Sequence, residues 1–251
     1  MPQLQAILLD ISGVLCDGEQ PIPGAVQAVR QLQDRGYPLR LITNTSRQGL
    51  TTIQRQLKAM GFEVQPEQFF TAPRAVRRYL QDHGLRPFCL IHPGLEEEFA
   101  QWLDQADPDA VVVGDAEMRF DYEHLNRAFQ LLIGGAPLIC MGDNRYFRAQ
   151  GALHLDAGPF VRALEYAAGT TALVLGKPSA DFFASALDDM GVRADQALMI
   201  GDDVVADIIG AQAAGLHACL VRTGKYRQGD ESQAPEALVA ADLAEAVARY
   251  C

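Results

Sequence analysis

The stretch ILLDISGVLCDG at residues 7–18 decides the fold. It is a short apolar run that leads straight into Asp10, with Ser12 and Gly13 close behind. An uninterrupted short apolar run is typical of a strand that is buried on both faces of a parallel sheet. Asp10 therefore stands where such a strand ends, at the edge where ligands usually bind. Taken alone, a carboxylate at this position is a nucleophile, a metal ligand or a helix cap.

Outward from this stretch, short apolar runs alternate with amphipathic segments along the chain. Helical patterns are expected at residues 24–35, up to Met60, from Asp121 and after Ser179, which has the features of an N-cap. Residues 144–156 have no clear period and are expected to form a loop or a hairpin. The alternation predicts an α/β fold with a mostly parallel sheet that helices cover on both faces. The expected strands are residues 6–9, 39–43, 89–92, 110–113, 138–141, 172–175, 197–200 and 218–221.

The composition, with 49% hydrophobic and 21% charged residues, is that of a globular protein. A net charge of −11 repels nucleic acids and anionic membrane surfaces, so neither is expected as a partner. Asp10 interrupts the first apolar run, which is atypical of a signal peptide, and no run is long enough for a membrane span. Five widely spaced cysteines without a CxxC pattern favour a reducing compartment, so we expect a cytoplasmic protein.

Three more apolar runs end in polar residues. LRLITNTS at residues 39–46 is expected to end a strand at Thr43 and to open a helix. Hydroxyl and free N–H groups at a helix N-terminus bind anions, although an N-cap at Thr45 or Ser46 explains the same pattern. LVLGKPSADFF at residues 173–183 places Lys177 on a constrained backbone, where a lysine is either a phosphate ligand or a solvated loop residue.

The last run is followed by acids, in ALMIGDDVVADIIGAQAAG at residues 197–215. Asp202, Asp203 and Asp207 repel one another unless a cation joins them, although acids also stabilise a helix N-terminus. Oxygen donors without histidine or cysteine favour Mg²⁺. The carboxyl edge of one parallel sheet would bring all four motifs together.

In this order and spacing, the four motifs resemble those of the haloacid dehalogenase superfamily of aspartate-nucleophile phosphatases, over the whole chain. The resemblance implies that Asp10 attacks phosphorus and that Lys177 balances the charge. The implied substrate-binding residues are Ser12, Thr43, Asn44, Thr45 and Lys177. The implied Mg²⁺ ligands are Asp10, Asp202 and the backbone carbonyl of Ser12. Asp203 and Asp207 are implied to support these ligands without contacting the metal.

The resemblance also implies two domains. The insertion between the second and third motifs is similar to the large α/β cap, type C2, of subclass IIA. We therefore predict a doubly wound, Rossmann-like core at residues 1–78 and 173–251 and an inserted cap at residues 79–172. Related enzymes with this cap are often dimers, so the resemblance is compatible with a homodimer. The stretches GLRPFCLIH, LDAGPFVRALEYA and VRTGKYR are similar, more narrowly, to phospholysine phosphohistidine inorganic pyrophosphate phosphatases.

One position departs from the usual pattern of the superfamily. The pattern is Asp-x-Asp, whose second acid protonates the leaving group, and Ser12 stands in its place. General acid catalysis is worth ~10²–10⁴-fold, and serine is a poor acid at neutral pH. A phosphoramidate can be protonated on nitrogen and pyrophosphate leaves as a stable anion, so both need the acid less. The prediction is a Mg²⁺-dependent phosphatase that uses an aspartyl-phosphate intermediate on P–N and P–O–P bonds of a small molecule or a phosphorylated side chain.

Three alternatives stay open. The chain is also compatible with a general phosphatase of nucleotide or sugar phosphates. A metal-independent dehalogenase would use an aspartate nucleophile as well. A catalytically weak phosphate-binding module would retain Ser12 as a relic. A nicotinamide-dependent enzyme is disfavoured, because no GxGxxG follows the first strand.

Polar residues of the inserted segment are candidates for reading the leaving group. Lys225 and Arg227, after the last strand, are weaker candidates at the same sheet edge, and His217 is expected to be structural. The candidates in the cap are His92, Asn144, Arg145, Tyr146, His154 and Asp156.

Overall fold

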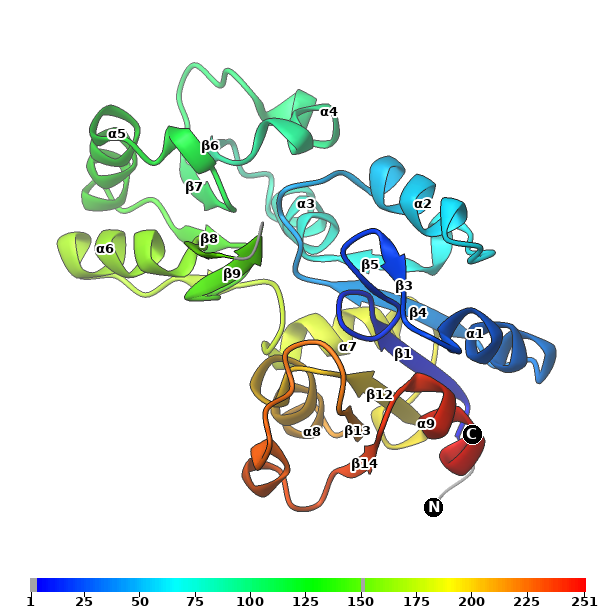
Figure 1. Cartoon of the computed structure of the whole chain (residues 1–251). Coiled ribbons are helices and arrows are strands. Elements are labelled where there is room, and N and C mark those ends of the chain that lie inside the picture. The colour runs from blue at the N-terminus through cyan, green and yellow to red at the C-terminus, as the bar shows by residue number, and fades with distance from the viewer. Residues whose placement is uncertain (1–3, 150–151) are drawn as a thin grey trace. The chain divides into compact units, whose positions relative to one another are not determined.

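The computed structural model describes residues 4–149 and 152–251, and the chain divides into two compact units (Figure 1). The first unit comprises Met1–Thr43, Leu50–Thr71 and Lys177–Cys251, and the second comprises Asn44–Gly49 and Ala72–Gly176. The second unit therefore extends beyond the predicted insertion at residues 79–172 at both ends. It also takes a short segment, Asn44–Gly49, that the sequence assigned to the core.

The first unit is built on a parallel sheet in the order β14-β13-β12-β1-β4-β5, which Figure 1 shows strand by strand. Its strands are β1 (Ala6–Asp10), β4 (Leu39–Thr43), β5 (Phe69–Thr71), β12 (Ala197–Gly201), β13 (His217–Val221) and β14 (Leu238–Ala240). Its helices are α1 (Ala25–Asp34), α2 (Leu50–Ala59), α7 (Ala180–Asp188), α8 (Gly210–Ala213) and α9 (Leu243–Tyr250). A small antiparallel hairpin, β2 (Cys16–Asp17) and β3 (Gln20–Pro21), follows β1.

Helices cover both faces of this sheet. Successive side chains of a strand point to opposite faces, and Ile7 and Leu9 of β1 pack into a core with α1, α2 and α9. In addition, Phe70 of β5 packs against Phe182 of α7, with ring centroids 5.1 Å apart. Burying each of these large side chains stabilises the fold by about 1.5–3 kcal/mol. The doubly wound architecture expected from the sequence is confirmed.

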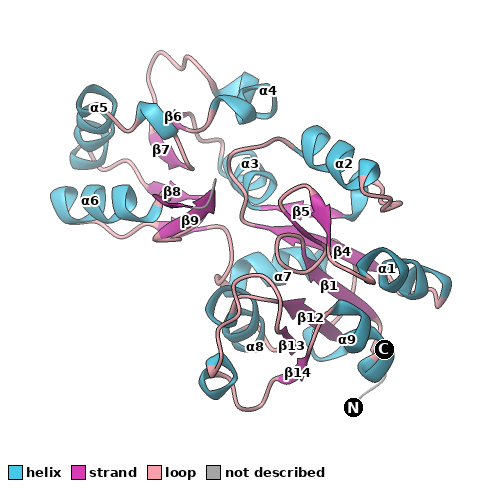
Figure 2. Cartoon of the chain, in the orientation of Figure 1, coloured by secondary structure: helices cyan, strands magenta, loops and turns pink. Residues whose placement is uncertain are grey.

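The second unit has its own parallel sheet, in the order β11-β8-β7-β6, of which Figure 2 labels β8, β7 and β6. A core between this sheet and the helices includes Val111, Val113, Leu132 and Leu164. The strands are β6 (Pro87–Leu90), β7 (Ala110–Val113), β8 (Leu138–Cys140) and β11 (Leu173–Val174), and an antiparallel hairpin has β9 (Tyr146–Ala149) and β10 (Ala152–Leu155). The helices are α3 (Ala72–His83), α4 (Glu96–Phe99), α5 (Tyr122–Ile133) and α6 (Gly158–Ala168).

Each predicted strand is present within two residues of its expected ends. Three differences from the sequence predictions matter. Strands β5 and β14 at the two sheet edges were not foreseen. Strand β11, before Lys177, belongs to the second sheet and not to the core sheet. Ser179 does occupy the N-cap position of α7, but its side chain makes no capping hydrogen bond.

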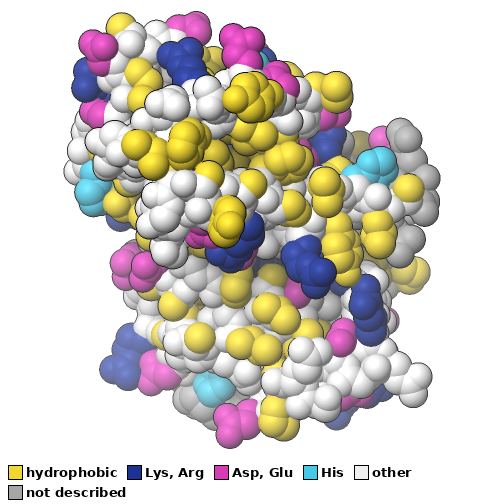
Figure 3. All heavy atoms as spheres, turned by 90° about the vertical axis from the view of Figure 1, so that its left-hand side faces the viewer, with side chains coloured by type: hydrophobic (Ala, Val, Ile, Leu, Met, Phe, Trp, Pro, Cys, Tyr) yellow, Lys and Arg dark blue, Asp and Glu magenta, His cyan; other side chains and the backbone are white. Residues whose placement is uncertain are grey.

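Large hydrophobic side chains are exposed mainly on the second unit. Figure 3 shows such side chains interspersed with charged ones on one face of the molecule. Within the described residues, no helix combines the length and the hydrophobicity needed to cross a bilayer. The exposed hydrophobic residues of the second unit include Met118, Tyr122, Ile133, Tyr146, Leu153, Leu155 and Tyr166.

Candidate active site

Three aspartates come together at the carboxyl edge of the first unit's sheet. Asp10 is the last residue of β1 and Asp202 follows β12, and these strands pair in parallel, so their ends are neighbours. Asp207 lies in a π-helical turn, Val204–Ile209, that follows β12. One carboxylate oxygen from each of the three lies within 4.8 Å of the others, and all three residues are buried.

Lys177 brings a positive charge into this cluster. Its Nζ donates hydrogen bonds to Asp10 Oδ1 at 2.5 Å and to Asp207 Oδ1 at 2.6 Å, and the residue is only 4% exposed. Burial opposes the charge, but Asp10 and Asp207 outweigh burial and raise the pKa of Lys177 above its ordinary value. Lys177 therefore stays charged at neutral pH, and the alternative of a solvated loop lysine is wrong.

Asp202 has one engaged oxygen and one free oxygen. Its Oδ2 accepts a hydrogen bond from the backbone N–H of Lys225 at 2.6 Å. Its Oδ1 is buried and has no hydrogen-bond partner among the residues that the structure describes. Burial, followed by repulsion from Asp10 and Asp207, raises the pKa of Asp202 to about 8. A buried oxygen of this kind is costly unless a proton or a cation satisfies it.

The cluster therefore fits a hard divalent cation. Burial also raises the pKa of Asp207 to about 6, although Lys177 acts in the opposite direction. Lys177 pairs with Asp10 and Asp207, so among the described residues the third carboxylate, Asp202, has no ion-pair partner. The donors are all oxygen atoms, which are the ligands that Mg²⁺ prefers in proteins. The Oδ1 atom of Asp202 and the carboxylate of Asp10 are the donors best suited to hold it.

Ser12 follows Asp10 by two residues, and Thr43 ends the strand that pairs with β1. Ser12 is exposed, in the turn that follows β1, and forms an isolated bridge to Cys16. Thr43 is buried at the end of β4, where the neighbouring Ile42 is in register with Asp10. Both residues therefore lie at the edge that carries the carboxylates, as the motifs predict.

The residues after Thr43 do not open a helix, contrary to the sequence prediction. The next helix, α2, begins only at Leu50, so Thr45 and Ser46 are not its N-caps. The intervening segment, Asn44–Gly49, belongs to the second unit, so Asn44 and Thr45 are residues of that unit. The roles of these two residues in binding phosphate stay predictions.

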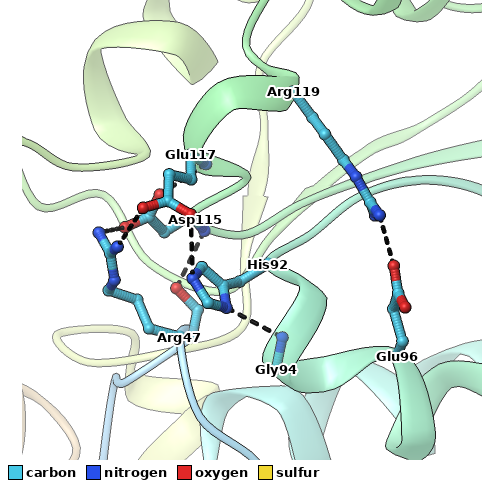
Figure 4. A network of polar contacts seen from close by, with 8 residues as sticks. Arg47, His92, Gly94, Glu96, Asp115, Glu117 and Arg119 are labelled. Atoms are coloured by element: carbon cyan, nitrogen blue, oxygen red, sulfur yellow. Dashed lines mark hydrogen bonds and ion pairs between the residues drawn. The ribbon is translucent and has the colours of Figure 1, made fainter.

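A polar network within the second unit holds this segment (Figure 4). Arg47 pairs with Asp115 at 2.8 Å and with Glu117 at 2.9 Å, while the hydroxyl of Ser46 accepts from the N–H of Asp115 at 3.0 Å. His92 Nε2 lies 3.4 Å from Glu117, and its Nδ1 accepts from the N–H of Gly94. These tertiary contacts replace the expected helix start. His92, a predicted reader of the leaving group, is therefore already engaged by groups of its own unit.

The remaining candidates in the second unit lie on and beside the β9–β10 hairpin. Arg145 and Tyr146 line a cavity of about 570 Å³ together with Asp143, Leu155 and Arg162. Reading of a leaving group by any of these side chains stays a prediction. In addition, His154 stacks on Phe147 with centroids 5.5 Å apart, Asp156 accepts from the N–H of Ala157, and the carbonyl of Asn144 accepts from Gly158.

Asp203 has a different environment from the three clustered aspartates. Its Oδ1 accepts from the N–H groups of Val205 and Ala206, so it caps the π-helical turn. Lys225 Nζ lies 3.2 Å from its Oδ2. Burial works against its charge, but Lys225 and the N–H of Ala206 lower the pKa of Asp203. Asp203 therefore has the alternative role considered in the sequence analysis, that of an acid at the N-terminus of a helical turn.

The loop after β13 contributes more than its motif suggested. Lys225, rated a weak candidate, contacts Asp202 through its N–H and Asp203 through its side chain. Gly13 and Gly224 have positive φ angles of 85° and 59°, and a Cβ on either would approach Asp202 Oδ2 to 2.0 Å. In the sequence, the glycine of VRTGKYR, Gly224, was the one feature that indicated a close approach of this loop to another group. The other weak candidate, Arg227, donates from its backbone to Asp230, and His217 contacts the carbonyl of Asp195, consistent with a structural role.

Comparison with known proteins identifies the family. Residues 7–102 match the model of the haloacid dehalogenase-like hydrolases, and residues 174–246 match a second model of HAD-hydrolase-like proteins. The phospholysine phosphohistidine inorganic pyrophosphate phosphatase of Mus musculus is 45% identical over 234 residues, which cover 91% of this chain and 86% of the relative. The chain belongs to the haloacid dehalogenase-like hydrolases. The resemblance drawn from the motifs, including its narrower group, is confirmed, and this hydrolase is an enzyme.

Solved structures with the same fold agree with this assignment. The p-nitrophenyl phosphatase from Archaeoglobus fulgidus superposes on this hydrolase with a TM-score of 0.90 at 25% identity, covering 98% of this chain and 99% of the other. A glycerol phosphate phosphatase from Mycobacterium tuberculosis in complex with magnesium gives a TM-score of 0.85 at 27% identity, covering 96% and 75%. The predicted fold class is thereby confirmed.

Proposed function

We propose that this hydrolase is a Mg²⁺-dependent phosphatase that works through an aspartyl-phosphate intermediate. The observation that carries the proposal is the pairing of Asp10 with the buried Lys177 beside the free oxygen of Asp202. Phosphatase names among its relatives and the magnesium in one related structure support it.

The chemistry follows from the positions of the side chains. Asp10 attacks phosphorus, the leaving group departs with the bonding electrons, and water then hydrolyses the aspartyl-phosphate. Lys177 holds Asp10 by a hydrogen bond and offsets the negative charge that develops on the phosphoryl oxygens. Thr43, assisted by Asn44 and Thr45, binds those oxygens. Asp10, Asp202 and the carbonyl of Ser12 would hold Mg²⁺, which would supply neutralisation of the charge on carboxylate and phosphate.

The proposed substrate class is supported by the residue at position 12, an exposed serine whose hydroxyl is a poor general acid. Phospholysine, phosphohistidine and pyrophosphate need that acid least, and they are the substrates in the name of the related mouse enzyme. The second candidate is a phosphatase of phosphate esters, which the names of the two structural relatives favour. In both cases the second unit acts as a cap that reads the leaving group.

Ser12→Asp tests the substrate preference. Aspartic acid restores the missing proton donor, so turnover of a sugar phosphate is expected to rise by ~10²–10⁴-fold while hydrolysis of P–N and P–O–P bonds changes much less. Orthophosphate release from phospholysine, phosphohistidine, pyrophosphate and a sugar phosphate is measured side by side, with Ser12→Asn as the neutral control of similar size. If the wild type prefers the sugar phosphate and Ser12→Asp gains nothing on it, the explanation of Ser12 is wrong.

Removal of the metal tests the cofactor. Because a bound cation contributes several kcal/mol to such a reaction, chelation with EDTA is expected to lower orthophosphate release by at least ~10²-fold. Excess Mg²⁺ should restore the release, which shows that the protein survived the treatment. Turnover that persists in EDTA would instead favour metal-independent chemistry of the dehalogenase type.

Location and assembly also belong to the proposal. Five free cysteines, three of them buried, support a reducing, cytoplasmic compartment. The exposed hydrophobic side chains of the second unit support a homodimer, since such side chains often mark an interaction surface. The partners are then a small phosphorylated substrate and a second copy of the chain, with neither nucleic acid nor membrane.

A further inference from the structure

We infer that Thr223 is a positioning residue for the metal site, and that the loop of residues 223–225 holds the site in its binding geometry. This inference rests on the proposed function and adds a residue that none of the four motifs contains. Three features of the loop carry it: a hydroxyl that binds the turn after β1, and a backbone N–H and a glycine that both face Asp202.

The hydroxyl of Thr223 ties this loop to the turn that follows β1. Its Oγ1 donates a hydrogen bond to the carbonyl of Gly13 at 2.5 Å. Gly13 is the residue after Ser12, whose own carbonyl is a proposed Mg²⁺ ligand. Because adjacent peptide planes are linked at one Cα, fixing the Gly13 carbonyl also restricts the orientation of the Ser12 carbonyl. A side chain from the loop after β13 thus constrains the backbone beside the nucleophile.

The backbone of the same loop sets the orientation of Asp202. The N–H of Lys225 holds Oδ2 at 2.6 Å, which leaves Oδ1 as the unpartnered oxygen among the described residues. Gly13 and Gly224 pack against Oδ2 from two backbones, and a Cβ on Gly224 would also come within 2.5 Å of the Cα of Gly13. The carboxylate therefore has little freedom to rotate. Its one free oxygen is presented in advance, so less ordering is required when a cation binds.

The Thr223 hydroxyl keeps these close contacts in place. It donates a hydrogen bond that joins the turn at Gly13 to the loop that contains Gly224 and Lys225. Without this hydrogen bond, the backbones at Gly13 and Gly224 are held together less firmly where they pack against Asp202. Groups that orient metal ligands in this way typically contribute a factor of ~10–100 to metal affinity. A purely structural hydroxyl would instead affect stability alone.

The experiment compares Thr223→Val, which removes the hydroxyl at nearly constant shape, with Thr223→Ser, which keeps it. The affinity for Mg²⁺ alone is measured by isothermal titration calorimetry, and the melting temperature is recorded for each variant. Thr223→Val is expected to weaken Mg²⁺ binding by ~10–100-fold, and Thr223→Ser to bind like the wild type. Ser232→Ala is the matched control, because the Ser232 hydroxyl also donates to a carbonyl, that of Gly229, in an exposed loop.

The outcomes separate this inference from the proposed function. If the wild type binds Mg²⁺ and releases phosphate while Thr223→Val keeps the wild-type affinity, the inference is overturned and the function stands. A lower melting temperature with unchanged affinity overturns it as well. A wild type that neither binds Mg²⁺ nor releases phosphate refutes the function itself. If Thr223→Val does not fold, Thr223→Ala replaces it with the same expected loss of affinity.

Discussion

Asp10→Asn is expected to lower orthophosphate release by about 10⁴-fold or more. The substitution keeps the size of the side chain but replaces the attacking carboxylate with a weakly nucleophilic amide. It also removes one of the two proposed carboxylate ligands of Mg²⁺ and one of the two negative partners of Lys177. Single-turnover kinetics with excess enzyme measure the loss of the chemical step directly.

Asp17→Asn is the matched control for this variant. The same substitution is made seven positions further along, at an exposed side chain of β2. It should leave the rate unchanged, because that carboxylate lies outside the cluster of Asp10, Asp202 and Asp207. Orthophosphate release by Asp10→Asn at a rate near that of the wild type would rule out the covalent mechanism. The phosphate-binding module would be favoured by a different result, a wild type that releases no orthophosphate from any of these substrates in the presence of Mg²⁺.

Lys177→Met is expected to reduce both stability and activity. Methionine fills much the same volume, but Asp10 and Asp207 lose the cation that lies 2.5 Å and 2.6 Å from their oxygens. Breaking a buried ion pair from one side costs about 3–5 kcal/mol in the free energy of unfolding. Loss of a preorganised charge at the phosphoryl group is expected to lower kcat by ~10²–10³-fold.

Urea denaturation and steady-state kinetics check the two effects separately. Lys58→Met is the control, because Lys58 is exposed near the end of α2 and its substitution should change neither quantity. Saturating Mg²⁺ should recover part of the lost stability of Lys177→Met, since a ligand that binds only the folded state stabilises it. Unchanged stability without Mg²⁺ would contradict the buried pairing on which this prediction depends.

Most of the fold was predictable from local patterns. The apolar runs at β1, β7 and β12 are short and continuous, which is the pattern of buried parallel strands. The edge strands β5 and β14 were not predicted, because β5 has only two apolar residues before Thr71 and β14 lies in an alanine-rich stretch that also fits a helix. The predicted helix start at Thr45 was wrong for another reason. Arg47 and Ser46 make tertiary contacts to Asp115, and such contacts override local capping preferences.

The candidate site was predictable where a strand end determines the position. Asp10, Thr43 and Asp202 are each at, or directly after, the end of a strand of one sheet, so the edge rule for parallel sheets applies to them. The rule failed as an explanation for Lys177, whose preceding strand β11 lies in the other sheet. Lys177 nevertheless reaches the cluster, because the loop that opens α7 and not β11 determines its place.

The buried strands and the polar residues that follow them could be predicted from the amino-acid order, because hydrophobic periodicity is a property of neighbouring residues along the chain. Two features appear only in three dimensions. Lys177 bridges Asp10 and Asp207, and the N–H of Lys225 binds one oxygen of Asp202, while the other has no partner among the described residues. Every residue except proline carries the same backbone N–H, so only its position in space decides which carboxylate it holds.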